Sequence, residues 1–164
     1  MLRKSFFKKT FPLLAFGYLY SFFSGFGQTY IISLYVPAIA SFFSLSNAGF
    51  GSIYATATIA SGFTLPWLGS WYDKTPLKRY AFLVLLGLSL SLLLLSVSHY
   101  LWLLVLSLYG LRLFGQGLMG HTAVSTAARY FHHGRGKAIG TATLGHPTAE
   151  AIMPILTALV IGAI

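Results

Sequence analysis

The sequence contains no cysteine and almost no acidic residues. Without Cys among its 164 residues, the chain has no disulfide, no thiolate metal site and no thiol nucleophile. Asp and Glu occur once each, as Asp73 and Glu150, so an active site built on paired carboxylates is excluded. We therefore expect no enzyme, no bound metal and no cofactor. Only 8% of the residues are charged, whereas about a quarter are charged in soluble domains.

Apolar side chains take the place of the missing charges. Hydrophobic residues make up 56% of the chain and the mean hydropathy is +0.75. In water this composition would leave large apolar patches exposed. The net charge of +9 does not indicate a nucleic-acid partner, because the basic residues are scattered between apolar runs. The composition indicates a membrane protein whose surroundings are the lipid bilayer.

Long apolar runs divide the chain into membrane-spanning segments. A helix needs about 20 apolar residues to cross a hydrocarbon core of about 30 Å. The runs are continuous, which favours helices over the alternating strands of a barrel. The sequence predicts an all-α, polytopic transmembrane helical bundle, a single membrane domain over residues 1–164. The five predicted spans cover residues 11–43, 49–71, 80–98, 101–128 and 137–164.

The basic residues segregate to one side of these spans. Lys and Arg accumulate on the cytoplasmic side of inserted helices. Here the first and third connections contain none, and Arg112 alone lies inside a span. We therefore expect a multi-pass protein of the cell (inner or plasma) membrane with a cytoplasmic N-terminus. The ten residues on this side are Arg3, Lys4, Lys8, Lys9, Lys74, Lys78, Arg79, Arg129, Arg135 and Lys137.

The second connection carries a spaced motif. Its sequence from Gly69 is GSWYDKTPLKR, which resembles the signature loop of the major facilitator superfamily in its usual place between spans two and three. Pro76 stands where that family usually has Gly. We expect Gly69 to permit close helix approach, and Asp73 to accept hydrogen bonds from a helix N-terminus and latch one conformation. The alternative is a solvated basic turn that only orients the chain. The matching residues are Gly69, Asp73, Lys74, Lys78 and Arg79.

The fourth span contains a charge at membrane depth. The segment from Arg112 to Gly117 is similar to the family's Arg-x-x-x-Gly pattern. An intramembrane arginine costs at least about 2.5 kcal/mol, so we expect a partner. Arg112 lies about 24 Å from the cytoplasmic end of its helix and Glu150 about 21 Å from the start of its own. We predict an Arg112–Glu150 pair that reports proton or anion occupancy. The alternative is a purely structural ion pair.

Uncharged polar residues inside the spans are candidates for the substrate path. Gln28 and Thr29 lie in the first span, and His121 and His146 lie in the fourth and fifth. Amide, hydroxyl and imidazole groups also serve as hydrogen-bonding contacts between membrane helices, and this second interpretation stays open.

The resemblance covers the whole chain, as the first five helices of a six-helix N-terminal half in a family of twelve-helix carriers. It implies a secondary active transporter of small solutes that works by alternating access and is linked to protons, as in symport. Helices four and five look most like those of monocarboxylate and related organic-anion carriers. The implied partners are a small-molecule substrate, a proton and the remaining helices of a full-length carrier. The alternative is a truncated half, incompetent in transport, or a structural membrane protein.

Overall fold

The computed structural model describes the backbone of residues 2–162 and the side chains of residues 11–161. The described chain is helical and contains no strand, so the predicted all-α fold is confirmed. The last two residues of the predicted fifth span lie outside the described residues. The elements, in chain order, are α1 (Leu2–Phe23), the 3₁₀-helix η1 (Ser24–Gly27), α2 (Thr29–Phe42), α3 (Asn47–Lys74), α4 (Leu77–Ser96), α5 (Leu101–Gly110), the π-helix η2 (Leu111–Met119), α6 (Gly120–Tyr130), α7 (Arg135–Thr143) and α8 (Gly145–Gly162).

Among the described residues, three continuous helical stretches are long and apolar enough to cross a membrane. They are Leu77–Ser96, Leu101–Tyr130 and Arg135–Ile161. The first predicted span falls short because the chain is extended at Gln28, where φ is −87° and ψ is 153°, between η1 and α2. α3 has 28 residues but many Ser, Thr and Gly residues, which lower its hydropathy. The count of five spans therefore stays a prediction.

We number the helical stretches by the five predicted spans to which they correspond. The first stretch (α1, η1 and α2) and the fourth (α5, η2 and α6) cross backbone against backbone. A Cβ atom added to Gly115 of η2 would lie 2.6 Å from Gly27 Cα, and one added to Gly27 would lie 2.7 Å from Gly115 Cα. Real Cβ atoms do not approach so closely, so any side chain at either position would force the helices apart. The paired glycines explain why η1 and η2 touch here. We call this contact the crossing.

A nine-residue π-helix occupies the middle of the fourth stretch, between α5 and α6. π segments close i→i+5 hydrogen bonds, occur inside longer α-helices and are frequent at functional sites. The side chains of Leu111, Leu118 and Met119 are almost completely buried. α3 and α4 pack on η2, and α1 and α7 pack on α6. The fourth stretch is therefore the centre of the fold.

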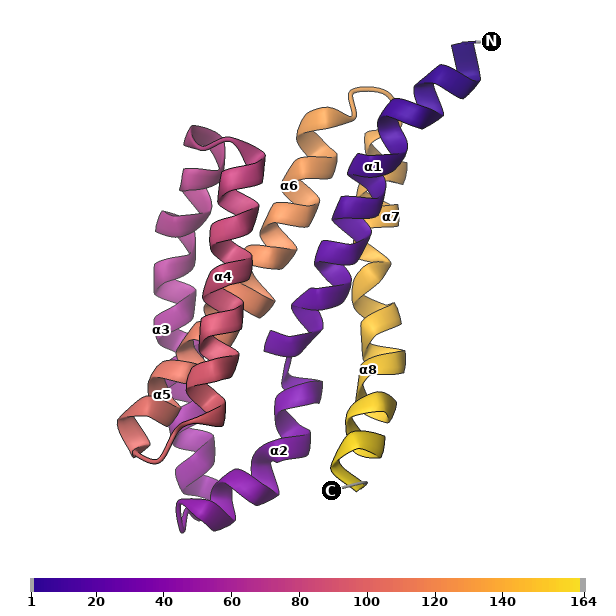
Figure 1. Ribbon diagram of the computed structural model, residues 1–164. Coiled ribbons are helices and arrows are strands. Elements are labelled where there is room, and N and C mark those ends of the chain that lie inside the picture. The colour runs from indigo at the N-terminus through magenta and orange to yellow at the C-terminus, as the bar shows by residue number, and fades with distance from the viewer. Residues whose placement is uncertain (1, 163–164) are drawn as a thin grey trace.

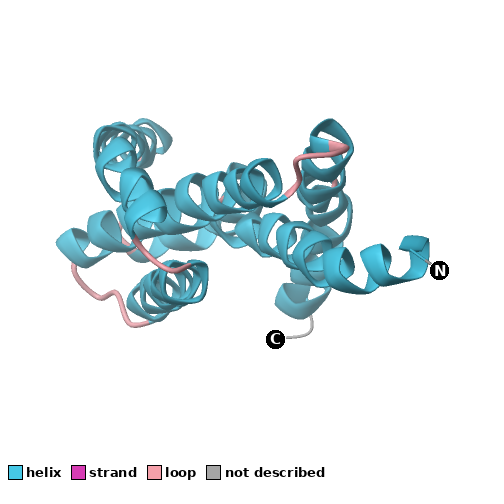
Figure 2. Cartoon of the chain, turned by 90° about the horizontal axis from the view of Figure 1, so that it is seen from above, coloured by secondary structure: helices cyan, strands magenta, loops and turns pink. Residues whose placement is uncertain are grey.

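The connections with basic residues lie at one end of the bundle. Figure 1 shows the N-terminus, the α3–α4 turn and the α6–α7 loop together at the top, with the α2–α3 and α4–α5 turns at the bottom. Seen from above, the helices fill an elongated outline (Figure 2). We call the top of Figure 1 the basic end, because these three segments carry ten of the eleven Lys and Arg residues.

Candidate functional site

Arg112 forms a polar cluster with two residues from other helices. Its Nη1 donates a hydrogen bond of 3.2 Å to Thr29 Oγ1, at the start of α2. Its Cζ lies 5.1 Å from the centre of the Tyr54 ring of α3, a cation–π distance. The hydroxyl oxygens of Thr29 and Tyr54 are 2.8 Å apart and share a hydrogen bond. We call Thr29, Tyr54 and Arg112 the guanidinium cluster.

The guanidinium cluster leaves the charge of Arg112 without a carboxylate. Arg112 is only 9% exposed, and its buried Nε has no hydrogen-bond partner. Thr29 and Tyr54 supply dipoles and a ring face but no negative charge. Since an arginine carries five N–H donors, the cluster retains unused capacity for an anion at this depth.

The predicted partner, Glu150, lies exposed on α8. Within the described part of the chain it forms no ion pair with Arg112; the ion pair there joins Arg129 and Asp73. Tyr30 lies between the two regions. It follows Thr29 in the chain and packs against the cluster of Ile31, Ala149 and Met153, and its buried hydroxyl has no partner among the described residues. The Arg112–Glu150 pair therefore stays a prediction.

A pocket lined mostly by residues with polar side chains lies beside the crossing, where the first, fourth and fifth stretches meet. Its volume is about 270 Å³. Two of the four predicted path residues, Gln28 and His146, line it, whereas Thr29 belongs to the guanidinium cluster. We call it the crossing pocket; its lining is Ser21, Ser24, Gln28, Gln116, Gly120, Val124, Thr143 and His146.

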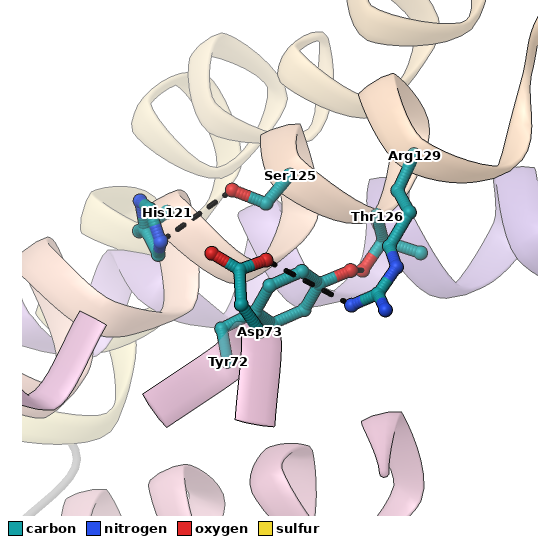
Figure 3. A network of polar contacts seen from close by, with 6 residues as sticks. All are labelled: Tyr72, Asp73, His121, Ser125, Thr126 and Arg129. Atoms are coloured by element: carbon teal, nitrogen blue, oxygen red, sulfur yellow. Dashed lines mark hydrogen bonds and ion pairs between the residues drawn. The ribbon is translucent and has the colours of Figure 1, made fainter. Parts of the chain in front are cut away.

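A second polar cluster joins α3 to α6 near the basic end (Figure 3). Asp73 Oδ1 lies 3.8 Å from Arg129 Nη1, and Arg129 Cζ lies 5.7 Å from the centre of the Tyr72 ring. The hydroxyl oxygens of Tyr72 and Thr126 are 3.1 Å apart. Asp73 and Arg129 are exposed, so their attraction contributes at most about 1 kcal/mol. We call the residues drawn in Figure 3 the latch cluster: Tyr72, Asp73, His121, Ser125, Thr126 and Arg129.

His121 belongs to the latch cluster and does not line the crossing pocket. Its ring centre is 6.1 Å from that of Tyr72 in an edge-to-face arrangement, and its Nε2 is 3.5 Å from Ser125 Oγ. A Cβ atom on Gly69 would lie 3.6 Å from the His121 ring, an ordinary contact. Gly69 is therefore not at the limit of close approach in this structure.

The signature motif is mostly helical. Gly69, Asp73 and Lys74 lie in α3, and Lys78 and Arg79 lie in the first turn of α4. Only Thr75 and Pro76 connect the helices, and Pro76 is the residue before α4, where its fixed φ suits a helix start. Lys74, Lys78 and Arg79 are exposed at the basic end.

Four residues of these clusters do not stand out in the sequence as site residues. Arg129 counts there only as an orientation signal, although it is the ion-pair partner of Asp73. The other three, Tyr54, Tyr72 and Thr126, contact the two arginines or each other. Tyr and Thr are common in membrane helices, and nothing in their spacing marks the ones that meet an arginine.

Comparison with known proteins gives one family. A family profile described as Major Facilitator Superfamily matches residues 17–164. Searches among curated proteins and among solved structures gave no match. The matched range includes the signature motif, both arginine clusters and the crossing pocket. With its helical bundle and apolar stretches, the chain belongs to the major facilitator superfamily of membrane transporters.

Proposed function

We propose that the chain forms the substrate-binding half of a secondary active transporter for small organic anions, coupled to protons and working by alternating access. The observation that carries this proposal is Arg112: it is buried, it lies in a π-helix at a crossing of two helices, and one of its N–H groups has no partner. A cation at this depth is rarely without function. An anionic substrate would supply the negative charge that Thr29 and Tyr54 do not.

Proton coupling is assigned to Glu150, the acidic residue of the fifth stretch. Two negative charges at membrane depth repel each other strongly, because the surroundings have a low dielectric constant. An anion arriving at Arg112 therefore favours the protonated form of Glu150, and anion and proton cross together without net charge. We propose that Tyr30 connects the two groups, because it packs against the cluster that contains Ala149 and its buried hydroxyl has no partner among the described residues.

The latch cluster supports alternating access. Asp73 and Arg129 connect α3 to α6 through an exposed, easily broken contact. We propose that this contact forms in one state of the cycle and opens in the other.

The small-residue face of α7 supports a second half of the carrier as partner, because added Cβ atoms at Gly136 and Gly140 would meet nothing within 4 Å.

Uptake into proteoliposomes tests the proposal. The full-length protein is reconstituted, and accumulation of radiolabelled pyruvate and gluconate is followed with and without an acidic exterior, against protein-free liposomes. We expect the acidic exterior to drive accumulation. Arg112→Gln should abolish uptake because the variant no longer binds the substrate. Arg129→Gln, the same substitution at the basic end, should still bind the substrate in a calorimetric titration.

The same assay separates coupling from binding. Glu150→Gln should lose accumulation driven by the pH gradient and keep exchange of labelled for unlabelled anion across the membrane. If accumulation driven by the gradient survives in Glu150→Gln, the coupling role of Glu150 is wrong.

Orientation is tested with single cysteines, which the Cys-free chain makes simple. We propose that the basic end faces the cytoplasm in the cell membrane. An impermeant thiol reagent added to intact cells should label Cys at Asn47 and His99 and leave Cys at Lys78 unlabelled. The reverse pattern would show the opposite orientation.

A further inference from the structure

The crossing pocket has a lining without a charged side chain. Two amides, one imidazole and three hydroxyl groups face it, together with Gly120 and Val124. A second ionic group of a substrate would find no side chain of opposite charge in this lining. The lining therefore selects against dianions and zwitterions and favours uncharged, hydrogen-bonding groups.

The hydroxyl groups of the lining are already partly used by the helix backbone. Ser24 Oγ donates to Ser21 O at 2.6 Å, and Thr143 Oγ1 donates to Ile139 O at 3.0 Å. Gln28 and Gln116 make no side-chain hydrogen bond with another residue of the described segment. Each amide presents a donor and an acceptor side by side, an arrangement that matches neighbouring hydroxyl groups on a carbon chain.

The pocket adjoins the guanidinium cluster. Gln116 follows Arg112 by four residues in η2, within one turn of the π-helix. Gln28 immediately precedes Thr29, the residue that accepts the hydrogen bond of Arg112. One ligand can therefore hold a carboxylate near Arg112 and extend its remaining atoms into the pocket. With about 270 Å³, the pocket lies slightly below the usual range of ligand sites, about 300–1,000 Å³, which indicates a small molecule.

We propose that the crossing pocket binds the polyhydroxylated part of a substrate whose carboxylate is held by Arg112, so that the substrate class is a sugar acid with a single negative charge. This inference rests on the proposed function, because Arg112 supplies the anion site. Gln28 and Gln116 bind the hydroxyl groups, and Val124 packs against the C–H faces of the sugar chain.

Three probes divide the proposal into its parts. Isothermal titration calorimetry on the purified full-length protein compares gluconate with hexanoate, which has the same number of carbon atoms and the same charge but no hydroxyl groups, and with sorbitol, which has the hydroxyl groups but no charge. We expect gluconate to bind at least about tenfold tighter than hexanoate, since several hydrogen bonds of ordinary strength are added. Sorbitol should bind most weakly, because it lacks the charged contact.

Substitutions assign the two parts to their residues. Gln28→Leu and Gln116→Leu should each weaken gluconate binding about tenfold and change hexanoate binding by less than about twofold. Arg112→Gln should weaken both carboxylates and leave sorbitol unchanged. His146→Phe should weaken gluconate binding. The matched control is His99→Phe, in the α4–α5 turn at the end of the bundle opposite the basic end, which should leave gluconate binding unchanged. Circular dichroism and thermal unfolding verify that each variant is folded.

The outcomes separate the two proposals. Equal affinity for gluconate and hexanoate, both lost in Arg112→Gln, would overturn the role of the crossing pocket and leave the anion site intact. Sorbitol binding as tight as gluconate binding and insensitive to Arg112→Gln would overturn the sugar-acid class together with the anion site. If neither carboxylate binds the wild-type protein, the proposed function as an anion carrier is wrong, and the proposal for the crossing pocket is wrong with it.

Discussion

The guanidinium cluster and the latch cluster share an arginine, a tyrosine and a threonine, and they differ in burial. In each, an arginine lies over a tyrosine ring and the tyrosine hydroxyl shares a hydrogen bond with a threonine. Arg112 is 9% exposed and has no carboxylate beside it. The side chain of Arg129 is 51% exposed and lies 3.8 Å from Asp73. The same local design thus occurs at two depths.

The difference shows where charge can carry specificity. At the basic end, water and salt screen Arg129 and Asp73, so their contact can form and break at little cost. At the crossing, the helices bury Arg112, and the same guanidinium would attract an anion far more strongly there. We interpret the exposed cluster as a conformational contact and the buried one as a binding site.

Replacing a glycine by alanine should give the largest difference in stability between the crossing and the latch cluster. Gly115→Ala places a Cβ atom 2.6 Å from Gly27 Cα, in backbone that has no room to move, and we expect a loss of about 3 kcal/mol or more. Gly69→Ala near the latch cluster should be tolerated, because its Cβ atom would meet His121 at 3.6 Å. Thermal unfolding of the purified variants measures both. Equal melting temperatures would show that the crossing is looser than described.

Arginine substitution should separate the clusters by function. Arg112→Gln removes a charge-assisted contact worth about 1.5–3 kcal/mol, so anion affinity should fall about 10- to 100-fold. Arg129→Gln should leave anion affinity unchanged. Arg112→Lys keeps the charge and loses the planar guanidinium, so part of the affinity should return. Calorimetric titration with gluconate measures these effects, and an equal loss in Arg129→Gln would remove the distinction.

Removal of a tyrosine hydroxyl should destabilise the protein more at the latch cluster than at the guanidinium cluster, whereas arginine substitution has its larger effect at the guanidinium cluster. Tyr72→Phe leaves the fully buried Thr126 hydroxyl without its tyrosine partner, at a cost of about 1–3 kcal/mol. Tyr54→Phe should cost about 1 kcal/mol or less, because Thr29 is exposed and keeps its bond from Arg112. The double variant Tyr72→Phe, Thr126→Val should recover part of the stability. Equal melting points for the single variants would contradict the difference in burial.

The smallest expected effect on stability is that of Asp73→Asn. The exposed pair contributes at most about 1 kcal/mol, so unfolding should hardly change while the balance between inward-open and outward-open states shifts. Reactivity of a single Cys placed at Gly140 reports that balance in the full-length protein. If Cys at Gly140 reacts equally with and without Asp73→Asn, at both low and high salt, the signature motif is only an orientation signal.

The sequence predicts the helices and the positions of the charges, because both follow from local properties. Continuous apolar runs require helices in a bilayer, and the isolated Arg112 stands out against its neighbours. Two residues of the predicted substrate path, Gln28 and His146, line the crossing pocket. Gln116, four residues after Arg112, lies within the predicted motif, and its facing the same pocket becomes visible only when the helices are packed.

The break in the first span and the π-helix in the fourth could not be predicted from periodicity. Both lie at the contact between Gly27 and Gly115, which are far apart in the sequence. The partners of Arg112 and Asp73 depend on the same packing. Sequence reasoning matched the two intramembrane charges, Arg112 and Glu150, by depth alone, whereas depth says nothing about which helix faces lie together.

The π-helix also sets the angular phase between the two ends of the fourth stretch. A π-helix closes i→i+5 hydrogen bonds and so holds more residues per turn than the 3.6 of an α-helix. The nine residues from Leu111 to Met119 therefore turn the chain through a smaller angle than nine α-helical residues would. The same residues in an α-helix would rotate Thr126 and Arg129 away from Tyr72, while Arg112, near the start of the π segment, would keep its place. The length of this segment therefore fixes whether binding residues and latch residues face their partners at the same time.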